Sequence, residues 1–225
     1  GYRLAPHLPP TWPHVLAFPL ALTLMAGNDF PFPVVGVVHV ANRITVRRPI
    51  PVGTPLDLEV TAADLRPDER GQAFDVVATA TVDGEEVWHG LSTYLRRASA
   101  GGARPPREPV APPAATAKWR VERSVGPAYA AVSGDHNPIH TSRLGARAFG
   151  FKRPIAHGMW SKARCVAALE GRLPDAYTVD VAFKLPILLP ATVAFAAHGT
   201  SDPGWNFWLH DTRSGRPHLA GTVRP

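Results

Sequence analysis

The segment at residues 98–116, ASAGGARPPREPVAPPAAT, is rich in alanine, proline and glycine and shows no apolar periodicity. Proline fixes the backbone angle φ and removes a hydrogen-bond donor, so this composition favours an extended connector over a helix or a strand. The segment therefore predicts that the chain of 225 residues folds as two halves, residues 1–97 and residues 117–225, joined by a linker.

The two halves repeat one order of elements. In the first half an apolar stretch at residues 15–25 precedes β-rich segments such as ITVRRPIPVGTPLDLEV, and in the second a helical pattern at residues 158–169 precedes VAFKLPILLPATVAFAA. A helix followed by a run of antiparallel strands predicts an α+β fold in which each sheet wraps one helix. Each helix should then be apolar on most sides and lie in the core. In the second half the helically spaced apolar residues are Met159, Ala163, Val166, Leu169 and Leu173.

The net charge of +6 comes from basic residues spread along the chain without a long basic run. A basic surface of this kind suits an acidic small ligand or an acidic carrier. The combination of aromatic and basic residues that marks nucleic-acid-binding modules is absent from the sequence. We therefore expect no nucleic-acid partner.

Cys165 is the one cysteine of the chain, which excludes an intrachain disulfide and any zinc site built from several cysteines. This usage is typical of a reducing compartment, and we expect a cytoplasmic protein. Cys165 lies within the second predicted helix, where we expect it to pack in the core.

The stretch HVLAFPLALTLMAG at residues 14–27 is similar in composition to the core of a signal peptide. It is interrupted by Pro19 and is too short to span a bilayer as a helix. We interpret it as a buried helix and expect no membrane span. Since the chain starts at Gly1, we also expect the first half to be truncated at its start.

The segment SGDHNPIHTSRLGARAFGFKRPIAHGM, residues 133–159, gathers one acidic and several imidazole side chains around two prolines. Residues 125–134 predict a short helix that ends at Gly134, so Asp135 follows outside it. Pro138 disfavours the α conformation at Asn137, and the chain must turn before His140. On a helix Asp135 and His140 would point about 140° apart, whereas on a turn they can converge.

A converging carboxylate and imidazole can hold one water molecule and move its protons. Adding water across a C=C bond conjugated to a thioester requires a base, a proton for the α-carbon and donors for the developing enolate oxygen. In PIAHGM the N–H of Gly158 at the start of a helix has no partner within the helix, and it can serve as such a donor. The absence of a G-x-S-x-G motif argues against a serine hydrolase.

The motifs SGDHNPIH, PIAHGM and FKLPILLPATV resemble, in this order, those of the MaoC-like family of (R)-specific enoyl-thioester hydratases and 3-hydroxyacyl dehydratases. The resemblance covers nearly all of residues 120–197 and implies the hot-dog fold. In the first half, LPPTWPHVLAFPLALTLMA and VGVVHVANRITVRRPI resemble the degenerate half of the family's double hot-dog members, in which two helices are each wrapped by an antiparallel sheet. The second half would then carry the active site, and the first half would leave room for the acyl chain.

The resemblance also implies roles for individual residues. Asp135 and His140 correspond to the catalytic pair, Gly158 to the oxyanion-hole glycine and Asn137 to the asparagine that steadies the turn. Val166 departs from the pattern, because some hydratases of the family carry an active-site serine there. We interpret His157 as a structural or pocket-lining group that supports the site.

The implied activity is the dehydration of (R)-3-hydroxyacyl thioesters and the reverse hydration of trans-2-enoyl thioesters, in fatty-acid or polyketide-type metabolism. No cofactor is expected, because coenzyme A or phosphopantetheine enters only as part of a substrate carried as acyl-CoA or on an acyl carrier protein. A homodimer remains open. Two alternatives remain open as well: a hot-dog acyl-thioesterase, and a protein that binds acyl thioesters without catalysis.

Basic residues between the two motifs have two interpretations. They can form a solvated face, or they can meet the phosphates of coenzyme A or the acidic surface of a carrier protein. These residues are Arg143, Arg147, Lys152 and Arg153.

No metal site is expected among the acidic and imidazole groups. Its ligands would be Asp135, His136, His140 and His157, but Pro138 disrupts the helical spacing that His136 and His140 would use.

Overall fold

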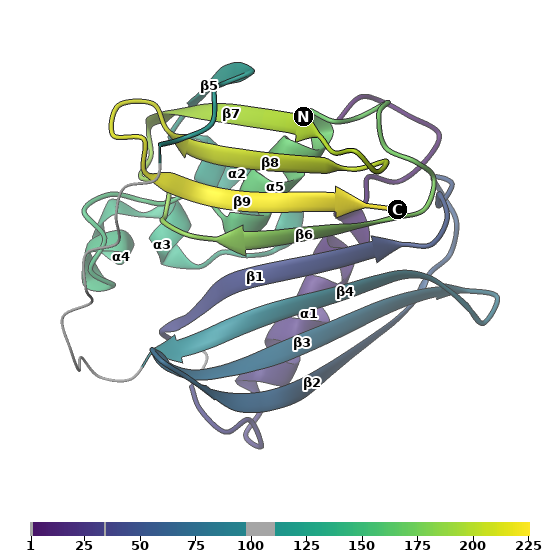
Figure 1. Ribbon diagram of the computed structural model, residues 1–225. Coiled ribbons are helices and arrows are strands. Elements are labelled where there is room, and N and C mark those ends of the chain that lie inside the picture. Colours follow the sequence, from purple (N-terminus) through teal and green to yellow (C-terminus); the bar gives the residue numbers. More distant parts are fainter. Residues whose placement is uncertain (1, 34, 98–110) are drawn as a thin grey trace.

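The computed structural model describes residues 2–33, 35–97 and 111–225. All the named strands of this part of the chain join one antiparallel sheet, in the order β2-β3-β4-β1-β6-β9-β8-β7-β5. Figure 1 shows that the long helices α1 and α5 both lie behind this sheet, on the same face. The α+β class predicted from the sequence is confirmed.

One end of the sheet comes from the first half of the chain. Helix α1 packs against strands β2 and β3 there. The elements of this half are α1 (Trp12–Ala26), β1 (Val37–Val46), β2 (Asp57–Asp68), β3 (Gly71–Val82) and β4 (Glu85–Arg97).

The other end of the sheet comes from the second half, and three helices precede α5 before the chain returns to the sheet. Its helices are α2 (Val125–Ser133), α3 (Pro138–Thr141), α4 (Arg143–Ala148) and α5 (Gly158–Ala167). Its strands are β5 (Ala117–Val121), β6 (Tyr177–Phe183), β7 (Ala191–Gly199), β8 (Trp205–Asp211) and β9 (Pro217–Arg224).

Helix α1 is less enclosed than the sequence predicted. Val15, Ala17, Ala21 and Met25 are buried against the sheet, but the leucines on the opposite side are exposed, with Leu20 at 46%. A helix that lies on one face of a sheet buries only a stripe of its surface, which is why the expectation of a helix buried on most sides is wrong here. In α5 the prediction holds better, since Met159, Val166 and Cys165 are in the core.

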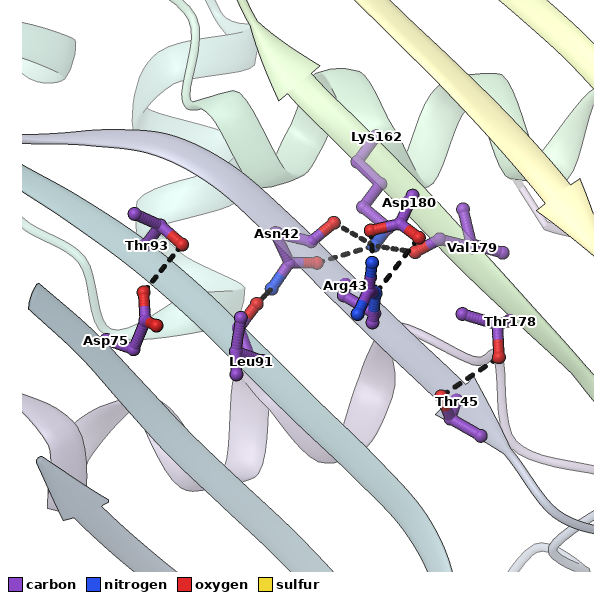
Figure 2. A network of polar contacts seen from close by, with 10 residues as sticks. All are labelled: Asn42, Arg43, Thr45, Asp75, Leu91, Thr93, Lys162, Thr178, Val179 and Asp180. Atoms are coloured by element: carbon purple, nitrogen blue, oxygen red, sulfur yellow. Dashed lines mark hydrogen bonds and ion pairs between the residues drawn. The ribbon is translucent and has the colours of Figure 1, made fainter. Parts of the chain in front are cut away.

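The seam between the halves is the pairing of β1 with β6, with Ile44 opposite Val179. Lys162 of α5 is fully buried beneath this seam (Figure 2). Its Nζ donates to the main-chain oxygens of Asn42 and Val179, both at 3.0 Å, and to Oδ1 of Asn42 at 2.5 Å. Three acceptors match the three N–H bonds of an ammonium group. Burial lowers the pKa of Lys162 well below its usual range, and the charge of Asp180 opposes this shift.

The predicted linker, 98–116, falls mostly on residues 98–110, which lie outside the described residues. Residues 111–116 form neither helix nor strand. The division into residues 1–97 and 117–225 stays a prediction. Within the described ranges, no helix is both long and apolar enough to cross a membrane.

Candidate active site

The end of α2 sets the position of Asp135. Gly134 follows the helix in the left-handed conformation with φ of 74°, which glycine adopts without strain. The hydroxyl of Ser133 donates to the main-chain oxygen of Tyr129 at 2.8 Å and accepts from the N–H of Asp135 at 3.2 Å. The chain thus leaves the helix in a fixed direction just before the acidic residue.

The turn after Asp135 is built from its own side chains. Oδ1 of Asp135 accepts from the N–H of Asn137, and Oδ1 of Asn137 accepts from the N–H of Ile139, both at 3.2 Å. Asn137 has a non-helical backbone and caps α3, which begins at Pro138. Pro138 suits this first helical position because its missing N–H would have no partner there. The short helix then carries His140 back toward Asp135.

His140 is buried and held in one tautomer. Its Nδ1–H donates to the main-chain oxygen of Ile155 at 2.8 Å, so Nε2 carries the lone pair. That nitrogen lies 3.9 Å from Oδ2 of Asp135, too far for a direct hydrogen bond. Burial lowers the pKa of His140, while the hydrogen bond to Ile155 and the charge of Asp135 oppose this effect.

His157 stacks on His140, with ring centroids 3.6 Å apart and planes inclined by 26°. Its Nε2–H donates to the main-chain oxygen of Asp135 at 3.1 Å. Burial and the neighbouring His140 lower the pKa of His157 to about 4. The ring is therefore neutral at physiological pH, and its contacts support the position of Asp135 and the orientation of His140.

Helix α5 begins at Gly158, directly after His157. The first N–H groups of a helix have no partner within it and lie at the positive end of its dipole. A side chain at Gly158 would place its Cβ only 3.2 Å from the ring of Phe183. Glycine thus lets the ring of Phe183 pack closely against this helix end.

Of four aromatic residues at the site, only Phe183 belongs to one of the three motifs of the second half, since it begins FKLPILLPATV. Burial and the charge of Asp135 raise the pKa of both Tyr129 and Tyr94, and the ring of Tyr129 lies 4.9 Å from that of His157. The ring of His39 stacks on Tyr94 at 4.7 Å and lies 5.0 Å from Phe183. His39 and Tyr94 belong to β1 and β4, so the first half of the chain contributes to the wall of the site. Strand periodicity could have marked them only as half-buried.

Asp135, His140 and His157 place one potential ligand atom each within 4.8 Å of one another. His136, considered as a ligand from the sequence, is exposed and lies outside this cluster. Nε2 of His157 is engaged with the main chain of Asp135, and its Nδ1 is buried without a partner among the described residues. Two groups remain, a carboxylate and one imidazole nitrogen, whereas protein zinc sites use three or four ligands. The donor set suits a water molecule better than a metal ion.

The basic residues between the motifs do not gather at this cluster as one group. Arg143 and Arg147 are exposed on α4, and Lys152 is exposed in the segment after it. Arg153 is half-buried, and its guanidinium donates to the main-chain oxygen of Pro190 at 3.3 Å.

Comparisons with a family model, with related proteins and with a solved structure give consistent results. A family model described as a MaoC like domain matches residues 106–203. The chain is 41% identical to the 3-hydroxyacyl-thioester dehydratase X of Mycobacterium tuberculosis, over 100% of this chain and 81% of that protein. It is 27% identical to the enoyl-CoA hydratase ChsH3 of the same organism, over 84% of this chain and 65% of that protein. The crystal structure of HtdX from M. tuberculosis superposes with a TM-score of 0.88 at 38% identity, covering 100% of this chain and 90% of the other.

Proposed function

The chain belongs to the MaoC-like dehydratase family, and on this premise we propose that it interconverts (R)-3-hydroxyacyl thioesters and trans-2-enoyl thioesters. The match to the solved structure of HtdX supports the hot-dog fold expected from the sequence, with both helices against one continuous sheet where a separate sheet around each was expected. The protein is accordingly an enzyme of the hydro-lyase class.

The main support for the proposal is the distance between the Asp135 carboxylate and the His140 ring, which is too long for a direct hydrogen bond. Oδ2 of Asp135 and Nε2 of His140 lie 3.9 Å apart, and Nε2 has its lone pair free. A water molecule placed between them can bond to both, which is the usual explanation of a polar contact longer than 3.5 Å. The enclosing aromatic residues leave this water in a largely apolar setting, where the neutral form of His140 is favoured.

In the hydration direction, the oxygen of this water attacks C3 of the enoyl thioester. Neutral His140 accepts a proton from the water at Nε2, and the nearby carboxylate of Asp135 stabilises the imidazolium that forms. The proton held by the Asp135–His140 pair then passes to C2, so that one water has been added across the double bond. Dehydration is the same path in reverse.

Negative charge develops on the thioester oxygen during this step. The N–H of Gly158 at the start of α5, together with the helix dipole, supplies a donor for that oxygen. The absence of a side chain at Gly158 leaves room for the ring of Phe183 beside the start of α5. We assign Gly158 to the oxyanion hole because its N–H stands at the start of this helix.

The proposed reaction uses water and the carrier-bound acyl group, and it requires no redox partner or further cofactor. Coenzyme A or phosphopantetheine takes part only as the carrier of the substrate. The first half contributes His39 and Tyr94 to the site wall, and we propose that it also accommodates the acyl chain.

The proposal is tested by the absorbance of the enoyl-thioester band during incubation with crotonyl-CoA and with a longer trans-2-enoyl-CoA. We expect the wild type to remove the band and to form the (R)-3-hydroxy product. Asp135→Asn and His140→Ala should each lower kcat by about 10²–10⁴-fold, the usual contribution of a general acid or base. The control is His136→Ala, because His136 is exposed beside the same turn and should be dispensable.

Three outcomes would contradict the proposal. Activity that survives in both Asp135→Asn and His140→Ala would place the chemistry elsewhere. Release of free thiol without the hydroxy product would indicate an acyl-thioesterase. Tight binding of the enoyl thioester without turnover would indicate a non-catalytic acyl-binding protein.

A further inference from the structure

A cavity of about 610 Å³ lies beside the segment that leads into α5, outside the catalytic cluster. Its walls come from residues 185–192, from the hairpin between β8 and β9, and from the end of β5. Four arginines stand around it: Arg120, Arg153, Arg213 and Arg216.

The arginines leave this cavity with an excess of positive charge. Arg213 and Arg216 are exposed and form no ion pair with any described residue, whereas Arg120 pairs with Glu122. The acidic group in the cavity is Asp211, whose Oδ1 accepts from the N–H groups of Arg213 and Ser214 within the hairpin. Guanidinium groups with free N–H bonds are the preferred protein partners of phosphates.

One side of the cavity is apolar. Along residues 185–190, Leu185, Pro186, Leu188 and Pro190 line the cavity, while Ile187 and Leu189 point into the core at 3% and 1% exposure. A cavity lined by both apolar residues and arginines can accept a planar base together with its phosphates. A bare phosphate would use only the arginines.

The same segment is hydrogen-bonded to the residues that hold His140. The N–H of Ala156 donates to the oxygen of Ile187 at 2.9 Å, and the N–H of Leu189 donates to the oxygen of Pro154 at 2.8 Å. Between these two bonds lies Ile155, whose oxygen orients His140. From Arg153 in the cavity to His157 in the active site the chain can span no more than about 14 Å.

We infer that this cavity binds the nucleotide end of coenzyme A, with Arg213, Arg216 and Arg153 on its phosphates and the 185–190 segment against its adenine. The inference rests on the proposed function, because it requires a thioester carried by coenzyme A. The flexible pantetheine arm then runs past Arg153 to the thioester at Gly158. Of the four basic residues that the sequence suggested for this role, Arg153 alone lines the cavity.

A carrier protein is the other source of the same thioester chemistry, and the shape of the site argues against it. Protein partners bury broad surfaces of roughly 800 Å² on each side, whereas small-molecule sites are concave with volumes of about 300–1,000 Å³. The cavity of about 610 Å³ falls within the second range.

Direct binding provides the first test, because it does not depend on turnover. Calorimetric titration with adenosine 3′,5′-bisphosphate should show binding to the wild type. The double variant Arg213→Ala/Arg216→Ala should bind about tenfold more weakly, as expected for lost charge-assisted hydrogen bonds. Replacement of both residues by Lys should recover part of the affinity. Arg70→Ala, in the distant hairpin between β2 and β3, removes one positive charge as a control for long-range electrostatics.

Kinetics with truncated carriers provide the second test. For the wild type, KM should rise from crotonyl-CoA to crotonyl-dephospho-CoA and again to crotonyl-pantetheine, which lacks the nucleotide. The double variant should raise KM for crotonyl-CoA by about tenfold and leave crotonyl-pantetheine unaffected, with kcat unchanged for both.

Several results would overturn the inference. It fails if the wild type turns over the coenzyme A and pantetheine thioesters with equal KM. It also fails if Arg147→Ala on α4, rather than the double variant, removes the preference for coenzyme A, or if the double variant weakens turnover of an acyl carrier protein thioester alone. If the bisphosphate binds in the cavity but no enoyl thioester is hydrated, the proposed function fails and the nucleotide site stands.

Discussion

At the scale of single residues, one hydrogen bond decides what His140 can do. The oxygen of Ile155 holds its Nδ1–H, so the lone pair of Nε2 faces Asp135, and burial keeps the ring neutral. A histidine in water has neither a fixed tautomer nor a lowered pKa. Its ordinary pKa of 6.5 would leave it partly protonated near neutral pH. The enclosing structure therefore favours the neutral form of His140 that the proposed mechanism requires of a base in the hydration direction.

The pH dependence of hydration follows from this shift. The reaction needs neutral His140, so kcat/KM falls as the pH drops through the pKa of that residue in the free enzyme. Because burial lowers this pKa, we expect the acid limb of the kcat/KM profile below pH 6.5. The profile is measured with crotonyl-CoA for the wild type and for His136→Ala, which should coincide. An acid limb above pH 6.5 would contradict the assignment.

At the scale of elements, the contact between α2 and α3 is closer than any side chain allows. A Cβ built on Gly126 of α2 would lie 2.1 Å from the main-chain oxygen of His140. Glycine is normally unfavourable inside a helix by roughly 0.5–1 kcal/mol, so its presence there reflects the neighbouring backbone. The position of His140 thus depends on a glycine in another helix.

Replacement of a glycine inside a helix by alanine usually stabilises the protein. Gly126→Ala should instead destabilise it, because the new Cβ would collide with the main chain at His140. The main chain at His140 has to retreat by about 1 Å, a displacement that can lower kcat by ~10²-fold. Overpacking should also lower the free energy of unfolding by about 1–3 kcal/mol. Urea unfolding and steady-state hydration measure the two effects.

The matched control lies on the exposed side of the same helix. Ala128→Gly should cost about 1 kcal/mol through helix propensity and leave kcat unchanged. A Gly126→Ala protein that is more stable than the wild type and fully active would show that α2 and α3 are not in close contact.

At the scale of the whole molecule, the two halves share one sheet and one buried polar network. Besides the contacts of Lys162, Arg43 pairs with Asp180 at 2.9 Å and Thr45 contacts Thr178 at 3.0 Å across the seam (Figure 2). The exposed Arg43–Asp180 pair adds little stability, because solvent screens it. Lys162 is buried, and each of its acceptors would lose a partner without it.

Lys162→Met keeps the length of the side chain and removes its donors. Three buried acceptors are then left without this partner, and we expect the free energy of unfolding to fall by about 2–4 kcal/mol in urea titration. Asn42→Leu combined with Lys162→Met should cost less than the sum of the two single changes, since both sides of the contact become apolar. A Lys162→Met protein as stable as the wild type would show that the network does not hold the halves together.

The sequence by itself determined the order of elements, the α+β class and the local geometry around Asp135. These features depend on the backbone preferences of Gly134, Asn137 and Pro138, and such preferences act over a few residues. They require no knowledge of the remote chain. Asp135, His140 and Gly158 could be predicted as candidate catalytic groups because they lie within such short local motifs.

The tertiary structure alone decided which remote residues complete the site. His39 and Tyr94 reach it through the register of β1 and β4, Lys162 meets Asn42 across 120 positions of the chain, and Arg216 joins Arg153 at one cavity. It also decided that α1 buries only one stripe of its surface. Contacts of this kind follow from strand pairing and packing, and a slip of one residue in register would turn each side chain to the opposite face. No local pattern in the sequence carries that information.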